Sequence, residues 1–150
     1  MTTTLADLTA RTGLDVLDHL ERQVAIPVVD GLQAQGDLIV VPYALVTRSV
    51  RTLTPAVWDE VPAAGVELLR SAAGGNPHTL VADPGTCRWT SYVRDTTGLA
   101  LGLLDASAVA HLIHPEHGGT GIAPGRYVVR RQRERSTERT GWYGNRVIVD

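Results

Sequence analysis

Turn residues interrupt most of this chain at short intervals, and they constrain its fold more than any other feature. From Gly36 onward the interruptions include Asp83-Pro84-Gly85, Thr97-Gly98 and Pro124-Gly125, which are sequences typical of tight turns. The segments between them are short and read as strands. Strands that recur at roughly 8–12-residue spacing predict a β-sandwich or a small β-barrel rather than βαβ units.

The expected fold class is therefore mainly β, with an N-terminal helical segment. The predicted strands are residues 38–41, 66–70, 78–81, 88–94, 99–103, 109–113, 127–134 and 146–149. One further helical turn is expected over residues 53–60, because Thr54 can cap it and Pro55 suits the first helical position.

The N-terminal segment has the pattern of an amphipathic helix. Thr4 can cap this helix, Asp7 lies in its first turn, and leucines then keep roughly one face apolar as far as Val24. Gly13 can divide the helix into two pieces, and Pro27 ends it. A terminal helix of this kind is expected to pack on its own domain, the alternative being a partner chain.

The length of 150 residues and the hydrophobic content of 43% fit one compact unit that buries its own core. We assign residues 1–35 to a helical appendage and 36–150 to a β-rich domain. The net charge of -2 argues against generic attraction to nucleic acid or anionic lipid. The single cysteine, Cys87, excludes an internal disulfide framework, and no apolar run approaches the ~20 residues of a membrane span. With no signal-peptide pattern, these features predict a cytoplasmic protein without a membrane partner.

Three of the five histidines lie in the sequence AHLIHPEHGG. Imidazole binds zinc and other transition metals, and such a site needs several converging donors. Pro115 predicts a bend that can bring His114 and His117 together, and His78, which follows another turn, is the natural third ligand. Glu116 is a candidate fourth ligand, or a base acting on a bound water. The alternative is that these histidines only hydrogen-bond the backbone of their turn.

The sequence GRYVVRRQRERSTER carries arginines into the end of a predicted strand. Because alternate residues of a strand face opposite sides, this strand begins as core and ends with arginines on both faces. Guanidinium groups suit carboxylates and phosphates, and nearby aromatic rings would add stacking for single-stranded nucleic acid. A solvated edge strand and a salt-bridged surface between subunits fit the same pattern. The candidate interface residues are Arg130, Arg131, Arg133, Arg135, Trp142 and Tyr143.

Familiar enzyme motifs are missing from the sequence: it has no GxxxxGK[ST] phosphate loop and no GxSxG elbow. Cys87 and a histidine are formally a nucleophile pair, but a lone cysteine on a predicted strand is usually a small core residue. Trp58, Trp89 and Tyr92 are expected to be core or interface anchors. His111 lies on a predicted strand and faces either the core or solvent.

The segment HPEHGGTGIAPGRYVVRRQRE resembles a pattern of small uncharacterised bacterial proteins, in which H-x-E-H precedes a Pro-Gly turn, a tyrosine and RQRE. Those proteins also carry a glycine-histidine motif upstream. Gly75-Asn76-Pro77-His78 matches its second histidine, and an asparagine stands where the first is expected. The resemblance covers about residue 66 to the C-terminus and implies a β fold without an established activity. Cupins are the nearest well-understood comparison, although the cupin HxH…E spacing is absent.

Three functions remain open at this point. The first, which we carry forward, is a non-enzymatic β-rich protein that self-associates or docks to a protein partner. The second is a cupin-like metal-binding module or metal-dependent hydrolase built on His78, His114 and His117, with a divalent transition metal such as zinc as cofactor. The third is single-stranded nucleic-acid binding through residues 130–135.

Overall fold

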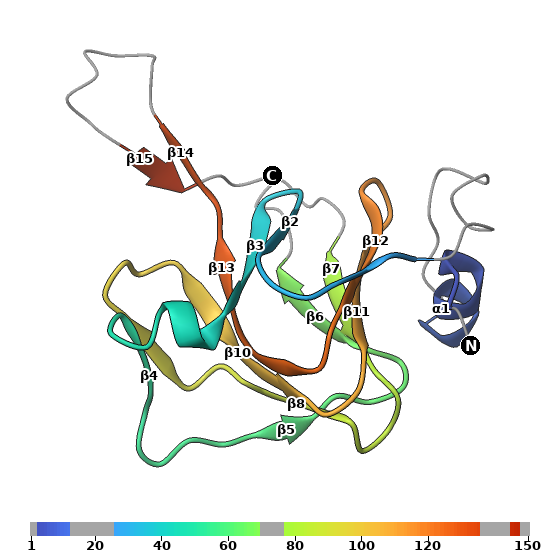
Figure 1. The fold of residues 1–150 in the computed structure, drawn as a ribbon, viewed down its shortest axis with the longest axis horizontal. Coiled ribbons are helices and arrows are strands. Elements are labelled where there is room, and N and C mark those ends of the chain that lie inside the picture. Colours follow the sequence, from blue (N-terminus) through green and yellow to red (C-terminus); the bar gives the residue numbers. More distant parts are fainter. Residues whose placement is uncertain (1–2, 13–25, 70–76, 136–144, 148–150) are drawn as a thin grey trace.

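The structure is a computed structural model that describes residues 3–12, 26–69, 77–135 and 145–147. Two sheets form the body of the molecule (Figure 1). The five-stranded sheet has the order β1 (Val28–Val29), β12 (Gly118–Ile122), β11 (Ala110–His114), β7 (His78–Val81) and β6 (Val66–Leu69). The six-stranded sheet has the order β2 (Gln33–Gln35), β3 (Leu38–Pro42), β13 (Gly125–Arg131), β10 (Ala100–Ala106), β8 (Cys87–Thr90) and β5 (Asp59–Glu60).

Two smaller strand pairs and two short helices complete the described chain. The pairs are β4 (Val50–Thr52) with β9 (Val93–Asp95) and β14 (Arg133–Arg135) with β15 (Asn145–Val147); the helices are α1 (Leu5–Thr12) and η2 (Tyr43–Leu45). Only β1 and β12 pair in parallel; the other pairings among these strands are antiparallel. The mainly β prediction is confirmed, and none of the sheets closes into a barrel.

The main core lies between the two sheets because alternate residues of each strand point inward. Leu104 on β10 lies opposite both Trp89 on β8 and Tyr127 on β13, and all three are buried in one cluster. Leu112 and Leu80 join that cluster from the five-stranded sheet. Trp89 is thus the core anchor that the sequence predicted, and Cys87 is a small residue of the same core.

Each sheet is also covered on its outer face. Leu5 and Leu8 of α1 pack with Val81 and Ile113 on the outer side of the five-stranded sheet. On the six-stranded sheet, Val128 packs outward with Leu103 and Val50, and the half-buried Trp58 lies against the same cluster. Side chains from both faces of the central strands are therefore buried, so the molecule has four layers.

The N-terminal helix begins as the sequence predicted. The backbone N–H of Asp7 donates to the Thr4 hydroxyl at 3.2 Å, and the N–H of Thr4 donates to the Asp7 carboxylate at 3.0 Å. This reciprocal pair is a capping box. Its hydrogen bonds lower the pKa of Asp7. The rest of the predicted helix, residues 13–25, lies outside the described part of the chain.

Two expectations need correction. Residues 53–60 contain no helix: the segment ends in β5, which pairs with β8 as an edge strand of the six-stranded sheet. The division at residue 35 also falls inside the β2–β3 hairpin, so β1 and β2 belong to the sheets rather than to a helical appendage.

Within the described residues, no helix has the length and apolar character that a membrane span requires.

Candidate functional site

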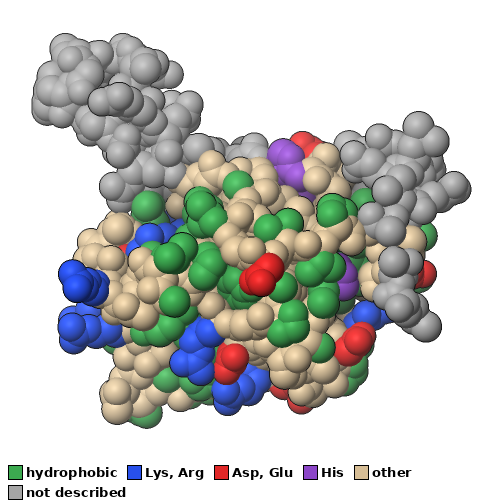
Figure 2. All heavy atoms as spheres, in the orientation of Figure 1, with side chains coloured by type: hydrophobic (Ala, Val, Ile, Leu, Met, Phe, Trp, Pro, Cys, Tyr) green, Lys and Arg blue, Asp and Glu red, His purple; other side chains and the backbone are tan. Residues whose placement is uncertain are grey.

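The turn between β11 and β12 brings the three predicted histidines together. His78 comes from β7, His114 from the end of β11 and His117 from the turn itself. The ring centroids of His78 and His114 are 4.4 Å apart, those of His114 and His117 are 4.5 Å apart, and those of His78 and His117 are 6.1 Å apart. We call these three residues the histidine cluster. Figure 2 shows a histidine beside an acidic side chain at this edge, where His117 and Glu116 are exposed.

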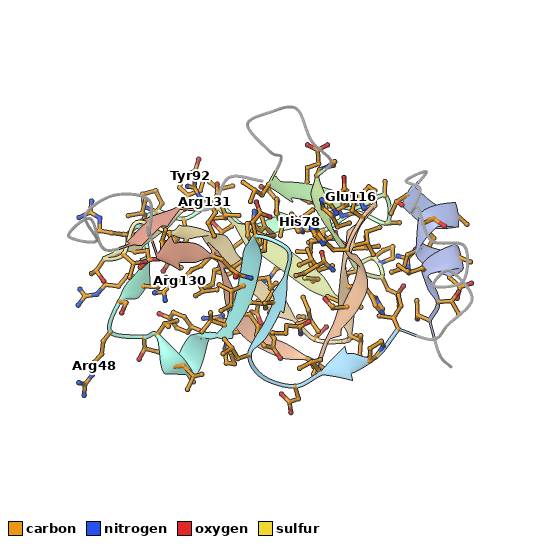
Figure 3. The ribbon with its side chains drawn as sticks, turned by 90° about the horizontal axis from the view of Figure 1, so that it is seen from above. Arg48, His78, Tyr92, Glu116, Arg130 and Arg131 are labelled. Carbon is orange, nitrogen blue, oxygen red and sulfur yellow. The ribbon has the colours of Figure 1, made fainter. Side chains whose placement is uncertain are left out.

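The β2–β3 turn supplies the hydrogen-bonding partners of His78, which lies inside the molecule (Figure 3). Its Nδ1 is 3.0 Å from Gln35 Oε1, and its Nε2 is 2.6 Å from Asp37 Oδ1. The side chains of His78 and Asp37 are 2% and 3% exposed. The amide nitrogen of Gln35 donates to the backbone oxygen of Leu112 at 2.8 Å, so its Oε1 is the atom that faces His78. His78 Nδ1 therefore donates to Gln35.

A proton must consequently lie between His78 and Asp37. Because Nδ1 already carries a proton, a neutral ring would turn the lone pair of Nε2 toward a carboxylate, and two acceptors do not approach to 2.6 Å. The pair therefore shares one proton across this contact. Burial and the neighbouring His114 lower the pKa of His78, whereas contact with Asp37 opposes that shift.

Gly36 lets the β2–β3 turn sit directly against the histidine cluster. Its φ of +56° is in the left-handed region, and a Cβ there would lie 2.6 Å from Cδ2 of His117 and 3.1 Å from Cε1 of His78. The Gln132 amide donates to the backbone oxygen of Gly36 at 2.8 Å and holds the turn from its other side. Residues of the HPEH and RQRE sequences thus meet at one place.

His114 serves its own turn. Its Nδ1 accepts the backbone N–H groups of Glu116 at 3.1 Å and His117 at 3.3 Å. This is the backbone role that the sequence left open as the alternative to metal binding. Among the described residues, no group of three or more His, Cys, Asp and Glu side chains has an arrangement that could hold a metal ion. The contacts of His114 and His78 give the reason, since Nδ1 of His114 and both nitrogens of His78 face other partners.

Comparison with known families adds one match. The model described as "Domain of unknown function (DUF8820)" matches residues 34–132. The chain belongs to this DUF8820 family. No curated protein and no solved structure matches the chain. The matched segment begins just before Gln35 and ends at Gln132, so it contains the histidine cluster and every partner described for it above, and it leaves out α1.

In this DUF8820 chain Arg130 is not available to a partner, and its assignment to an interface needs correction. Its Nε and Nη2 donate to the two carboxylate oxygens of Asp95 at 3.0 and 3.1 Å, and the two side chains are 15% and 3% exposed. Asp95 also accepts the backbone N–H groups of Thr97 and Ala100. Burial opposes ionisation of Asp95, but the hydrogen bonds from Thr97 and Arg130 outweigh it and lower the pKa.

The remaining predicted interface residues are placed only in part. Arg131 is half-buried, and its Nε is buried without a hydrogen-bond partner in the described structure. Arg133 and Arg135 lie on β14, and Trp142 and Tyr143 fall outside the described residues. The DUF8820 strand β13 is therefore mainly a core strand with a buried ion pair.

A surface that the sequence did not reveal lies on the β4–β9 pair. Arg51 and Arg94 are direct cross-strand partners, both are exposed, and neither forms an ion pair within the described chain. The N–H of Leu53 donates to the backbone oxygen of Tyr92 at 2.8 Å, which continues the pairing by one step. Leu53 and Tyr92 are 39% and 43% exposed. We call Arg51, Leu53, Tyr92 and Arg94 the ribbon face. The alternation of exposed and apolar residues in Arg51–Leu53 and Tyr92–Arg94 was its only sequence signal; the second segment was predicted as the end of a strand over 88–94, and Leu53 was placed in a helical turn.

Two other exposed arginines of the DUF8820 domain have partners. Arg88 and Arg126 both donate to Asp105 Oδ2 at 3.1 Å, and their guanidinium carbons lie 4.9 and 5.7 Å from the ring centroid of Trp58. Asp105 is opposite both arginines in the strand register. Arg88 and Arg126 therefore have a carboxylate partner within the protein, whereas Arg51 and Arg94 have none in the described chain.

Proposed function

We propose that this DUF8820 domain is a non-enzymatic binding module that docks an acidic segment of a partner protein on its ribbon face. The observation that carries the proposal is the pairing of Arg51 with Arg94. Like charges directly opposite each other on neighbouring strands destabilise the pair. Neither arginine has an ion-pair partner in the described chain, and a carboxylate bound between the two guanidinium groups would offset this repulsion.

The chemistry of the ribbon face favours an acidic peptide with an apolar side chain. Guanidinium forks bind carboxylates in a bidentate manner, and the exposed Leu53 and Tyr92 between them offer apolar contact. Tyrosine and arginine are also enriched where binding energy concentrates in protein interfaces. Single-stranded nucleic acid fits less well, because it needs a basic groove that follows several phosphates, and the chain carries a net charge of -2.

Two further observations support binding rather than catalysis. Burial, with the charge of Asp105, raises the pKa of the Cys87 thiol to about 11, which suppresses the reactive thiolate. Both ring nitrogens of His78 face other side chains, so that ring is a weak candidate for a general base.

The test uses three labelled probes and fluorescence anisotropy. The probes are a short peptide that alternates glutamate with leucine, the matched peptide with lysine in place of glutamate, and a short oligothymidylate. We expect the glutamate peptide to bind most tightly, and a variant carrying both Arg51→Glu and Arg94→Glu to bind it at least about tenfold more weakly, a change of ~1.4 kcal/mol.

Arg48→Glu is the matched control, since Arg48 is also exposed and makes no ion pair in the described structure. Arg48 and Tyr92 project from the body on different sides (Figure 3). Tighter binding of the oligothymidylate would replace the proposal with nucleic-acid binding. Equal weakening by Arg48→Glu, or a defined self-associated species that is lost with the double variant, would also overturn docking of a separate partner.

Zinc binding by the histidine cluster is a second candidate, favoured by the three close imidazole rings. Because no group in the described residues is arranged to hold a metal as it stands, a cation would have to widen the 2.6 Å contact between His78 and Asp37, with His117 as a further ligand once the rings turn. Elemental analysis of protein purified without a histidine tag tests this idea. Stoichiometric zinc that is lost with His117→Ala would support it; metal-free protein whose melting is unchanged by His117→Ala would exclude it.

A further inference from the structure

A second site lies on the opposite layer of the molecule, between α1 and the five-stranded sheet. A pocket of about 320 Å³ opens there, and its walls include Ile26, Val28 and Val109 together with Arg11, Asp83 and His111. Small-molecule sites typically begin at ~300 Å³, so this pocket has room for a ligand of about one ring with a substituent.

His111 is the polar group that marks this pocket. It lies in the middle of β11 between Val81 and Gly121, on the face that α1 covers, and it is 7% exposed. Its ring lines the pocket and makes no hydrogen bond with any other residue in the described structure. Its ring nitrogens are not among the fully buried polar atoms without a partner, so they are reached from the pocket and can bond a group from outside the chain.

The charges around the pocket restrict what can enter it. Arg11 donates to Asp83 Oδ1 at 3.1 Å and to the backbone oxygen of Ala82 at 3.0 Å, so this cation and this anion neutralise each other. Burial, and then the charge of Arg11, lower the pKa of His111, which keeps its ring neutral near pH 7 with one donor and one acceptor nitrogen. A carboxylate ligand would meet Asp83, and an ammonium would meet Arg11.

We infer that this pocket binds a small uncharged organic molecule with an apolar ring or chain and a head, such as an amide or hydroxyl group, that both donates and accepts hydrogen bonds. The head bonds to His111, and the apolar part contacts Ile26, Val28 and Val109. This site is independent of the ribbon face. The pocket lies against the five-stranded sheet, the ribbon face lies on the β4–β9 pair, and the two sites share no residue.

The experiment compares benzamide, benzoate and benzylamine, which share a ring and differ in the charge of the head. Binding is followed by NMR shifts of the isoleucine and valine methyl groups in the full-length protein. We expect saturable shifts with benzamide, affinities at least about tenfold lower for the two charged compounds, and a similar loss of benzamide binding in His111→Leu. His117→Leu is the control and retains benzamide binding.

A stability measurement separates this role from a structural one. Because the His111 side chain bonds no other described residue and leucine fills a similar space, His111→Leu should keep or raise the thermal midpoint while it weakens benzamide binding. Equal affinity for all three compounds, no saturable shift with benzamide, or unchanged benzamide binding in His111→Leu would each overturn the inference. A His111→Leu variant that is less stable than the wild type would also contradict it, since His111 would then be a structural residue.

Discussion

At the scale of single residues, three polar positions depart from the usual pattern of exposed, oppositely paired charges and solvated polar groups. His111 is largely buried and bonds no other described residue, Arg51 faces Arg94 across a strand pair, and His78 shares a buried proton with Asp37. Natural sequences depart from such local rules mainly at functional sites or where a buried network fixes one structure. His111 and the Arg51–Arg94 pair belong to our proposed binding sites, and the contact of His78 with Asp37 joins the two sheets.

The proton shared by Asp37 and His78 can be tested by substitution. In Asp37→Asn the introduced amide can donate to His78 Nε2, so a neutral ring keeps both of its hydrogen bonds without an added proton. Asp37→Ala leaves that buried nitrogen unpaired, which costs about 1–3 kcal/mol. We therefore expect urea unfolding to rank Asp37→Asn close to the wild type and Asp37→Ala well below it. Equal losses in the two variants would contradict the shared proton.

His111 predicts how stability depends on pH. Its pKa in the folded state is lowered from the usual 6.5 by burial and by Arg11, so the unfolded chain takes up a proton at higher pH than the folded chain does. The stabilising contribution is complete above that usual value and is lost as pH falls through it toward the lower folded pKa. Urea unfolding at about pH 7.5 and about pH 5.5 should show this loss, and His111→Leu should reduce it. An unreduced loss would assign the effect to other groups.

At the scale of elements, the sequence predicted strands well where local turn chemistry frames them. Residues 78–81 follow the sequence Gly-Asn-Pro, which predicts a turn, and β7 has these bounds. The glycine-rich β12 was missed because GGTGI reads as a turn; its glycines instead admit neighbours, since a Cβ on Gly119 would lie 2.6 Å from Leu5 and one on Gly121 would lie 2.9 Å from Val28. Segment 53–60 was predicted wrongly because its capping pattern is local, whereas the pairing of β5 with β8 is long-range.

The same limit applies to the candidate sites. Turn chemistry correctly indicated that His114 and His117 come together, but nothing local in the sequence identifies Gln35 and Asp37 as the partners of His78. Strand alternation also predicted the two faces of β13 without identifying Asp95 as the group that Arg130 meets. Such partners lie on other strands and come close only when the sheets pack.

Arg130 and Arg126 offer a matched comparison on β13, since both pair with an aspartate. Arg130→Met breaks a buried pair and should cost roughly 3 kcal/mol, at the low end for such pairs because Asp95 keeps hydrogen bonds from Thr97 and Ala100. Arg126 is 46% exposed, so Arg126→Met should cost less than about 1 kcal/mol. Urea unfolding measures both, and similar losses would show that the Arg130 pair is not a structural element of this strand.

At the scale of the whole molecule, the four layers separate structure from binding. The two central sheets enclose the main core, and the histidine cluster joins them at one edge. The outer layers carry the two proposed sites: the ribbon face over the six-stranded sheet, and the pocket between α1 and the five-stranded sheet. The DUF8820 match contains the ribbon face but not α1, so the proposed docking surface lies within the family segment, whereas the pocket also uses residues outside it.

The most direct test of docking is one variant measured twice. Arg51→Glu converts the like-charge pair into an opposite-charge pair with Arg94, so urea unfolding should show a gain of roughly 0.2–1 kcal/mol. The same variant should bind the glutamate–leucine peptide at least about tenfold more weakly than the wild type and the Arg48→Glu control do. A stability gain with lost affinity is the result that our account predicts. Unchanged peptide affinity in Arg51→Glu would contradict it, whatever happens to stability.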